Sequence, residues 1–470
     1  MLKSKALWTL ALGFMALHIA LAALLPLVED ETYYALWASV PSAGYFDHPP
    51  MIAWWIAAGQ ALLGDSPFAV RLLAVLASAL LTFLTYRIAW LYSKDATTAF
   101  TAALWGKAMI PFSVLAFAAT PDAPSVLFWT AAVWALAELT TSRNPNWWFA
   151  VGLFAALGIL SKFTDLFFAL AILLWLFASR EGRTWLPRWQ VWAGAALGLV
   201  ILAPFALWNY QNDWIGLERQ FGRVGAEGKF SLGGFVAFWA AFAMLVTPVL
   251  FWLAAKSLPS PKVPALLKWL IAPILIYMTG HALTSIAGGQ WLVPIYPTLA
   301  VIAALGAAHA RSARFAAPTG LALGVLIMVI GLWPGKILID SHNPFTQMRG
   351  WDRVTQDIRT RMKTENASWI ATDAYGLTGQ LSYYFDPQTP VWSLTDPERY
   401  LFRGPAPAEI CQEKGLLISR APISEARADV KKITLGADMT RNDGPIVVMR
   451  YYTAIISGPT AQAAFNCAAP

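Results

Sequence analysis

Charged side chains are scarce in this sequence. Only 13% of its 470 residues are Asp, Glu, Lys or Arg, whereas 57% are hydrophobic, and the mean hydropathy is +0.52. These values exclude a soluble globular protein of ordinary composition. No cluster of Lys and Arg interleaved with aromatic residues occurs, so the net charge of +7 does not indicate a nucleic-acid-binding protein. The sequence therefore predicts an integral membrane protein.

Cysteines and the spacings typical of metal sites are also scarce. No HxxxH or CxxC spacing occurs that would complete a zinc site, and no Gly-rich nucleotide-binding loop is present. The only cysteines are Cys411 and Cys467. In an oxidising compartment they would form a disulfide, which stabilises a chain with a loop of this length by about 4 kcal/mol. The alternative is two unpaired buried thiols.

The charge that is present lies mainly near the C-terminus. Residues 336–470 hold 29 of the 61 charged side chains. We expect a transmembrane domain over residues 1–333 and a soluble domain over residues 334–470. In that tail, "TQMRGWDRVTQDIRTRMK" has a helical pattern, whereas "SWIAT", "GLLIS" and "PIVVMRYYTAI" are β-rich runs, so the tail is predicted to be a small α/β domain.

The apolar segments predict a mostly α-helical bundle. A membrane-spanning helix needs about 20 apolar residues. Eleven candidate segments occur: 6–27, 68–91, 97–118, 123–140, 147–161, 164–178, 190–208, 233–255, 267–283, 291–309 and 316–333. No small-x-small cleavage site follows the first one, so we expect it to be a retained transmembrane helix and not a signal peptide.

The basic residues between these segments predict the orientation. If the N-terminus is cytoplasmic, one set of loops carries most of the positive charge, as the positive-inside rule requires. These residues are Lys3, Lys5, Lys94, Arg143, Arg180, Arg183, Arg188, Lys256, Lys262, Lys268, Arg311 and Arg314. With eleven helices the C-terminal domain then lies on the other side. Most acids of the membrane part are expected on that side too: Glu29, Asp30, Glu31, Asp47, Asp65, Asp122, Asp165, Asp213, Glu218 and Glu227.

The first external loop, residues 28–67, contains no Lys or Arg. In "EDETYY", Asp30 or Glu31 is a candidate general base, provided that burial raises its pKa. Tyr33 and Tyr34 beside them are typical of a sugar-stacking surface, and the alternative is an aromatic belt with an acidic cap. Residues 51–64 are apolar but short, which favours an amphipathic helix lying along the membrane interface.

The stretch "YFDHPP" is a second candidate site within this loop. Pro49 and Pro50 would hold Asp47 and His48 in place. The pair could bind a phosphate or share a divalent cation. One Asp and one His make a weak metal signal, so the cation is possible but not required.

The external cations are candidates for binding a phosphate. Lys162, Arg219 and Arg223 face the same side as the acids in the predicted topology. Lys107 lies inside an apolar stretch and either lines a headgroup cavity or extends its ammonium to the surface. Asp122 is either a helix N-cap or a functional acid.

A lesser polar group comes from the stretch near residue 290. It comprises His281, Gln290 and Trp291, with anchoring at the membrane interface as the alternative to a substrate-binding role.

Six stretches together resemble a known family. In chain order they are "VEDETYYALW", "GYFDHPPMIAWW", "LAFAATPDAPSVLFW", "GILSKFTDLFF", "FALWNYQNDW" and "GGQWLVPIYP". Over roughly residues 1–310 the chain resembles the GT-C glycosyltransferases of the aminoarabinose transferase and protein O-mannosyltransferase superfamily. These are integral membrane enzymes that take a sugar from a polyprenyl phosphate.

The resemblance implies roles for individual residues. Asp30 matches the catalytic acid of the first loop, and Asp122 matches the acid of the second loop. The element formed by Asp47, His48 and the two prolines matches the acid-x-Pro-Pro element that shapes the donor and acceptor site. The aminoarabinose transferases usually have Lys at the position of His48, so this chain departs from their pattern. Lys162 matches a basic position near the lipid phosphate.

The resemblance also implies an activity and a location. We expect a GT-C bundle of about 11 transmembrane helices in the bacterial inner membrane, with the C-terminal α/β domain in the periplasm. The expected reaction transfers a sugar with inversion from a polyprenyl-phosphate donor to lipid A, lipopolysaccharide or another glycolipid. Protein O-glycosylation and transport of a lipid-linked sugar are the alternatives. The expected partners are this donor, a glycolipid or protein acceptor and membrane lipids, and no nucleic acid.

Overall fold

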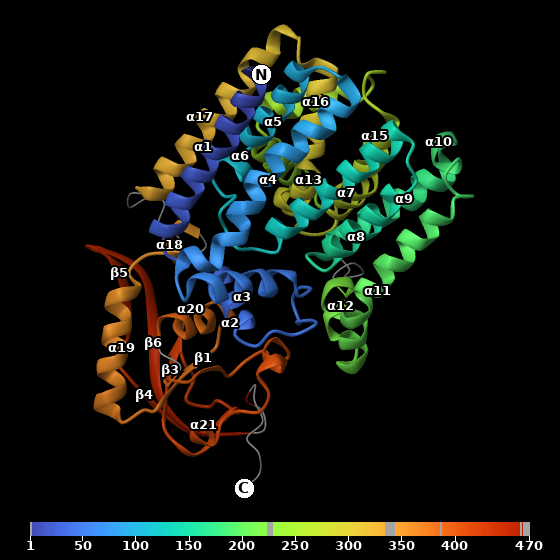
Figure 1. The fold of residues 1–470 in the computed structure, drawn as a ribbon. Helices are drawn as coiled ribbons and strands as arrows, with labels where there is room; N and C mark the ends of the chain where they lie inside the picture. Colours follow the sequence, from blue (N-terminus) through green and yellow to red (C-terminus); the bar gives the residue numbers. More distant parts are fainter. Residues whose placement is uncertain (1, 223–228, 334–343, 386–387, 461–462, 464–470) are drawn as a thin grey trace. The chain divides into compact units, whose positions relative to one another are not determined.

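The computed structural model describes residues 2–222, 229–333, 344–385, 388–460 and 463 (Figure 1). The chain forms two compact units. The helical unit comprises Met1–Ala22, His48–Ile52 and Arg71–Met328. The sheet unit comprises Ala23–Asp47, Ala53–Val70 and Val329–Pro470.

Helices account for nearly all regular structure from the N-terminus to residue 332. They are α1 (Leu2–Leu24), α2 (Glu29–Ala38), α3 (Met51–Leu63), α4 (Pro67–Ser93), α5 (Ala96–Ala108), α6 (Ile110–Ser113), α7 (Asp122–Ser142), α8 (Trp147–Ile159), η1 (Phe163–Asp165), α9 (Leu166–Ala178), α10 (Arg180–Arg183), α11 (Trp189–Gln211), α12 (Ile215–Phe221), α13 (Leu232–Val246), α14 (Pro248–Ser257), α15 (Ala265–His281), η2 (Gly289–Ile295), α16 (Tyr296–Ala307), η3 (Arg311–Phe315) and α17 (Ala316–Leu332).

Six helical stretches in the described residues are long and apolar enough to cross a membrane, or seven if one bent pair is counted as a span. The six are Lys5–Leu24, Pro67–Ser93, Asp122–Ser142, Trp189–Gln211, Gly289–Ala307 and Arg311–Leu332. The mostly helical membrane architecture is therefore confirmed. The prediction of eleven full-length spans is not confirmed, because the other apolar segments form shorter or interrupted helices.

The interruptions have local causes. The predicted segment 97–118 is divided at Met109, which has an extended backbone and precedes the Pro111-containing α6. The predicted segment 233–255 is bent by 98° at Thr247, whose φ is 76° and which is followed by Pro248. Helices α8 and α9 have 13 residues each, which at 1.5 Å per residue is about 20 Å, short of the hydrocarbon thickness of about 30 Å.

Aliphatic and aromatic side chains build the core of the helical unit, and glycines allow two of its helices to approach closely. Trp129 and Phe168 pack edge to face with a centroid separation of 4.9 Å. Helix α8 packs against both α7 and α11. Between α8 and α11 the backbones are close, since a Cβ added at Gly198 would lie 3.2 Å from the carbonyl oxygen of Gly152. Small residues of this kind allow helices to approach closely in a membrane.

The sheet unit adds helices and six strands after residue 343. The helices are α18 (Pro344–Gln347), α19 (Trp351–Glu365), α20 (Tyr375–Tyr384), η5 (Pro397–Arg403) and α21 (Ala408–Gln412). The strands are β1 (Trp369–Thr372), β2 (Val391–Ser393), β3 (Gly415–Ser419), β4 (Val430–Leu435), β5 (Met439–Asp443) and β6 (Ile446–Pro459). The predicted β-rich runs correspond to β1, β3 and β6, so a small α/β domain is confirmed.

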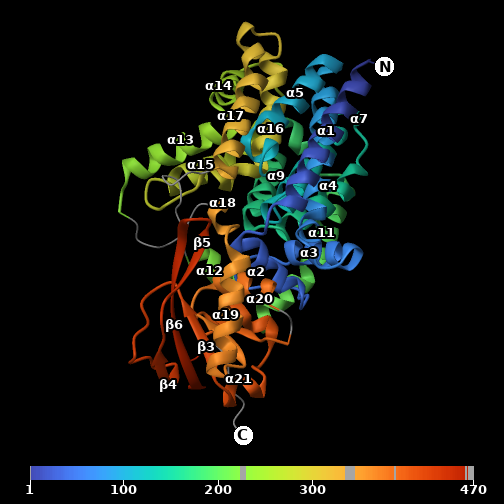
Figure 2. The ribbon, with the colours of Figure 1, turned by 90° about the vertical axis from the view of Figure 1, so that its left-hand side faces the viewer.

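The sheet is mixed, with the strand order β2-β1-β3-β6-β4, and β5 also pairs with β6. Strand β1 is parallel to β2 and β3, so that Ile370 lies opposite Val391 and Leu416. The long strand β6 is antiparallel to β3, β4 and β5. Figure 2 shows α19 running alongside these strands.

Alternation along the strands gives the sheet two apolar faces. On one face Ile370 and Leu416 pack with residues of α19 and α20, including Ile358 and Leu377. The other face has its own cluster, which includes Trp369, Leu417 and Ile456 of the strands and Ile410 of α21. The predicted helix over residues 346–363 is interrupted before α19, because Gly350 has a φ of 74°.

Helix α2 belongs to the sheet unit and packs directly on α20. Their backbones approach at Gly379, where an added Cβ would lie 2.7 Å from the backbone nitrogen of Tyr33. In addition, the Gln380 side chain donates a hydrogen bond of 3.0 Å to the carbonyl oxygen of Leu27. These contacts fix the carboxylates at the start of α2 relative to the tail.

We expect Gly379→Ala to destabilise the protein by about 1–3 kcal/mol, because the backbone of Tyr33 cannot yield to the new methyl group as a flexible side chain could. Gly280→Ala is the matched control, since Gly280 lies in α15 with no atom within 4 Å of an added Cβ. The measurement is the melting temperature of the purified variants. Equal melting temperatures for Gly379→Ala and the wild type would disprove the close packing of α2 on α20.

Candidate active site

The three acids that begin α2 have different surroundings. The buried carboxylate of Glu29 forms an ion pair with Arg420. Glu31 is fully buried and accepts a hydrogen bond of 3.0 Å from the backbone N–H of Val28, so it caps the helix. Asp30 is half-buried and accepts a hydrogen bond of 3.0 Å from Tyr375 Oη. The N-terminal end of a helix stabilises negative charge, which makes this grouping tolerable.

The environment of Asp30 favours its neutral form. Burial raises the pKa of the Asp30 carboxyl, and the nearby charges of Glu29, Glu31 and Asp47 raise it further. The hydrogen bond from Tyr375 acts in the opposite direction and lowers the pKa of Asp30. The condition set by the sequence for a general base, a carboxyl whose pKa is raised by burial, therefore holds for Asp30.

Asp47 lies in the same unit and is held by two partners. Its Oδ2 accepts a hydrogen bond of 3.0 Å from Tyr33 Oη and forms an ion pair with Arg399. The side chains of Arg399 and Asp47 are only 11% and 13% exposed, so water screens this pair weakly. Charge neutralisation by Arg399 explains how Asp47 is accommodated near the carboxyl of Asp30.

Tyr375 links these contacts into one cluster. Its ring lies 5.0 Å from the Tyr33 ring, edge to face, and the guanidinium of Arg399 lies 4.6 Å from its centroid. We call Asp30, Tyr33, Asp47, Tyr375 and Arg399 the Asp30 cluster. The cluster combines a carboxyl of raised pKa with a fixed cation and two packed aromatic rings.

Two members of the Asp30 cluster were not predicted. Tyr375 and Arg399 lie 345 and 352 residues from their partners Asp30 and Asp47. Tyr33 and Tyr34 were predicted to form a sugar-stacking surface, and both rings are largely buried. The ring centroids of Tyr33 and Trp37 are 4.9 Å apart, so Tyr33 packs within the interior of the sheet unit, as the buried Tyr34 does.

The helical unit brings together two other predicted residues. Lys162 Nζ forms an ion pair of 2.6 Å with Asp122 Oδ1, and the lysine side chain is only 12% exposed. The N-cap interpretation of Asp122 is wrong, because Asp122 is the first residue of α7, Pro121 is the cap residue, and no side-chain cap bond is made. Asp165 is buried near this pair, and its backbone N–H donates to the carbonyl of Lys162 at 3.0 Å.

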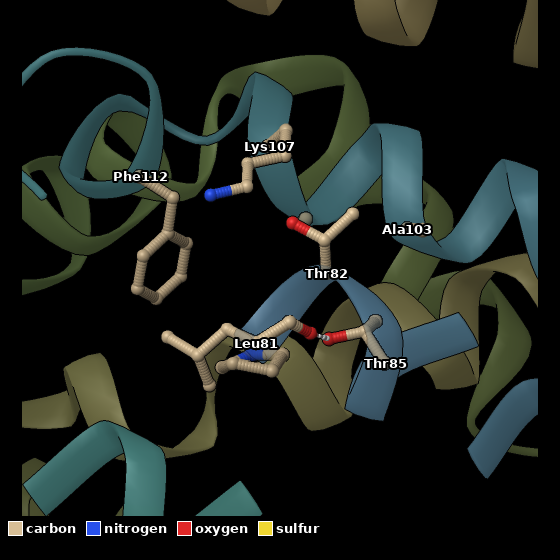
Figure 3. A pocket seen from close by; sticks show the side chains of 8 residues that line it. Leu81, Thr82, Thr85, Ala103, Lys107 and Phe112 are labelled. Atoms are coloured by element: carbon tan, nitrogen blue, oxygen red, sulfur yellow. Dashed lines mark hydrogen bonds between the residues drawn. The ribbon is translucent and has the colours of Figure 1, made fainter. Parts of the chain in front are cut away.

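Lys107 is buried within the helical unit and does not extend to the surface as a snorkelling side chain would. Its Nζ donates to the carbonyl oxygen and the hydroxyl of Ser78, at 2.7 and 2.6 Å. Figure 3 shows the ammonium in a pocket beside Thr82 and Phe112. The same Ser78 hydroxyl lies 3.3 Å from Nδ1 of the fully buried His18.

Three more of the predicted residues lie on other elements of the helical unit. Arg219 is in α12, and Gln290 is exposed in η2. His281 stacks on Tyr277 at 5.7 Å and also packs near Trp291, as expected for an aromatic anchor. Arg223 lies outside the described residues, as does Cys467, so the disulfide with Cys411 of α21 stays a prediction.

The metal prediction concerns Asp47 and His48. In the part of the chain that the structure describes, no group of three or more His, Cys, Asp and Glu residues is placed to hold a metal ion. Arg399 and Tyr33 both bind Oδ2 of Asp47, which is the type of carboxylate oxygen that would coordinate a divalent cation. A divalent cation at Asp47 and His48 stays a possibility that the sequence raises and that no further contact supports.

Several known proteins are similar to this chain in sequence. The family model described as dolichyl-phosphate-mannose-protein mannosyltransferase matches residues 47–208. The undecaprenyl phosphate-alpha-4-amino-4-deoxy-L-arabinose arabinosyl transferase of Yersinia pestis (strain Pestoides F) is 26% identical over 375 residues, which is 70% of this chain and 64% of the relative. A second transferase of that name, from Pseudomonas fluorescens (strain Pf0-1), is 26% identical over 66% of this chain and 62% of its own length.

The fold is likewise shared with a solved structure. The crystal structure of ArnT from Cupriavidus metallidurans bound to undecaprenyl phosphate superposes with a TM-score of 0.61 and 14% sequence identity. The match covers 96% of this chain and 97% of that one. The chain spans slightly less than two thirds of the length of the curated relatives it matches. The chain is therefore similar in sequence to the aminoarabinose transferases and shares the fold of one of them, and residues 47–208 match the mannosyltransferase family model.

Proposed function

We propose that this protein is a membrane glycosyltransferase that moves a sugar from a polyprenyl phosphate to an acceptor oxygen. The observation that carries the proposal is the surroundings of Asp30, whose raised carboxyl pKa suits an acid–base role and whose position matches the catalytic acid of the superfamily. The names of the curated relatives support the donor class. The acceptor we propose is lipid A, lipopolysaccharide or another glycolipid.

The proposed reaction is a single displacement at the anomeric carbon. The acceptor oxygen forms a bond to that carbon while the bond to the phosphate oxygen breaks, and the electron pair leaves with the polyprenyl phosphate. Asp30 takes the proton if the acceptor is a hydroxyl. If the acceptor is an ionised phosphate, no proton is transferred and Asp30 orients the nucleophile. A single displacement inverts the configuration of the sugar carbon.

Other residues hold and stabilise charge in this proposal. We assign Lys162, which is buried and paired with Asp122, to stabilising the negative charge that develops on the departing phosphate. Arg219 and Arg223 are assigned the same role, and His48 replaces the lysine usual in aminoarabinose transferases. Arg399 and Tyr33 position Asp47, which in turn shapes the site for donor and acceptor.

The proposed location is the bacterial inner membrane. We propose that the N-terminus is cytoplasmic, that residues 28–67 and the domain 334–470 are periplasmic, and that transfer occurs at the periplasmic face. This orientation places most basic loop residues in the cytoplasm, as the positive-inside rule requires.

Cysteine labelling in intact cells tests this orientation with two variants, Ser260→Cys and Asp396→Cys. Only the new cysteine at residue 396 should react with a membrane-impermeant reagent.

The direct test of function uses purified protein, a polyprenyl-phosphate sugar and a glycolipid acceptor extract. The proposal predicts release of free polyprenyl phosphate and appearance of the sugar on lipid A or another glycolipid. Appearance of the sugar on protein instead would replace the acceptor assignment. Movement of the donor across a vesicle membrane without cleavage would disprove the transferase proposal.

We expect Asp30→Asn to lower the rate by about 100-fold or more, because the amide can neither accept a proton nor bear the negative charge. Asp65→Asn is the matched control, since Asp65 is an exposed acid of the same predicted loop. The measurement is polyprenyl-phosphate release at saturating donor. A rate for Asp30→Asn equal to that of Asp65→Asn would remove Asp30 from the mechanism.

The pH dependence should follow the ionisation of Asp30. Only the ionised carboxylate is active, so the rate should fall as the pH is lowered through the raised pKa of Asp30, above the pH at which an ordinary Asp with a pKa of about 3.9 would titrate. Tyr375→Phe removes a hydrogen bond that lowers this pKa, so the acidic limb should move to higher pH. Tyr452→Phe, on β6, should leave it unmoved. A limb that stays in place in Tyr375→Phe would contradict the assignment.

Substitution of Lys162 tests the stabilisation of the leaving phosphate. We expect Lys162→Met to lower kcat by about 100-fold, the effect typical of losing one group that stabilises developing charge. Lys162→Arg should restore part of the rate, since it keeps the positive charge. If the lysine served only to neutralise Asp122, the double variant Lys162→Met with Asp122→Asn would recover activity, and recovery would overturn the proposed role.

A further inference from the structure

A basic pocket lies in the helical unit, and none of its lining residues has a catalytic or substrate-binding role in the proposal above. It has a volume of about 290 Å³ and is formed where the C-terminal ends of α14 and α16 meet the loops that follow them. The lining residues are Lys256, Ser257, Lys262, Leu305, Gly306, Ala307, Ala308, His309 and Ala310. Most of these residues have small side chains. Lys256, Lys262 and His309 are the lining residues whose side chains carry nitrogen.

The charge around this pocket has one sign. The described lining residues include no Asp or Glu, and the sequence has no acid at all between residues 228 and 339. Lys256 and Lys262 are both exposed, so their ammonium groups are available to a ligand. Lys256 lies in the last turn of α14, where the helix dipole stabilises a positive charge. The dipole does not explain the position of Lys262, because Lys262 lies in the loop beyond the helix end.

The residues beside the pocket are typical of a membrane interface. Lys256 Nζ lies 4.9 Å from the ring centroid of Trp252, and Arg314 lies 4.6 Å from that of Phe315. Both aromatic side chains are about half exposed, at 49% and 52%. Exposed aromatic rings covered by cations mark the level of lipid headgroups in membrane proteins.

We propose that this pocket binds the phosphate headgroup of an anionic glycerophospholipid. The two lysines and His309 would donate hydrogen bonds to the phosphate oxygens, and the exposed apolar surface near Trp252 would contact the acyl chains. A lipid fits better than a soluble phosphate compound because cations and exposed aromatic residues lie side by side. The proposal concerns a second, non-catalytic lipid site and does not depend on the transferase activity.

The test measures lipid retention by the purified full-length protein. Native mass spectrometry, or binding of a labelled lipid in detergent, compares phosphatidylglycerol with phosphatidylcholine. The wild type should retain phosphatidylglycerol preferentially, and Lys256→Gln with Lys262→Gln should weaken its binding by about tenfold or more, because each cation near a membrane surface adds to the attraction. Lys94→Gln is a matched control, since Lys94 also lies over a tryptophan, Trp90, at 4.6 Å, but outside the pocket.

Three results would overturn the proposal. Retention of phosphatidylglycerol by the double variant at the wild-type level would exclude the two lysines. An equal loss in Lys94→Gln would show a general effect of net charge. Displacement of the lipid by glycerol phosphate at equal concentration would show a soluble phosphate site. The melting temperature of each variant is measured in parallel, and because both lysines are exposed we expect it to be unchanged.

Discussion

The hydrogen bond from Tyr375 to Asp30 is the contact on which the rest of the account depends. Helix α2 begins with three consecutive acids, Glu29, Asp30 and Glu31. Repulsion between their carboxylates would be unfavourable if none of them had a partner. The structure gives each acid its own partner: Arg420 for Glu29, the backbone of Val28 for Glu31, and Tyr375 for Asp30. The partner of Asp30 is the phenol of Tyr375, and burial raises the pKa of the Asp30 carboxyl.

The sheet of the tail has a physical role in holding this arrangement. It fixes α20, and α20 supplies Tyr375 at its first residue and Gly379 at the close approach to α2. The segment that follows β2 supplies Arg399, which neutralises Asp47. Residues that follow the long helices in sequence therefore position acids that precede most of those helices.

The sequence predicted the elements whose signals are local. Three strands of the tail and the helix over 351–365 have clear periodicity. The sequence also predicts Asp122 and Lys162 as site residues, and the two form an ion pair in the structure. Tyr375 and Arg399 could not be found in this way, because contacts across about 350 residues leave no mark in hydrophobic periodicity. The count of eleven spanning helices is not confirmed, for a related reason: breaks at Met109 and Thr247 depend on backbone geometry that apolar composition does not reveal.

The central claim is that Tyr375 and the surrounding burial tune the ionisation of Asp30. Carbon-13 NMR of protein labelled at the aspartate carboxyl carbons measures that ionisation directly, and comparison with the Asp30→Asn variant identifies the signal. The account predicts that Asp30 titrates clearly above the ordinary range for aspartate. A titration at or below the ordinary value of about 3.9 would contradict it.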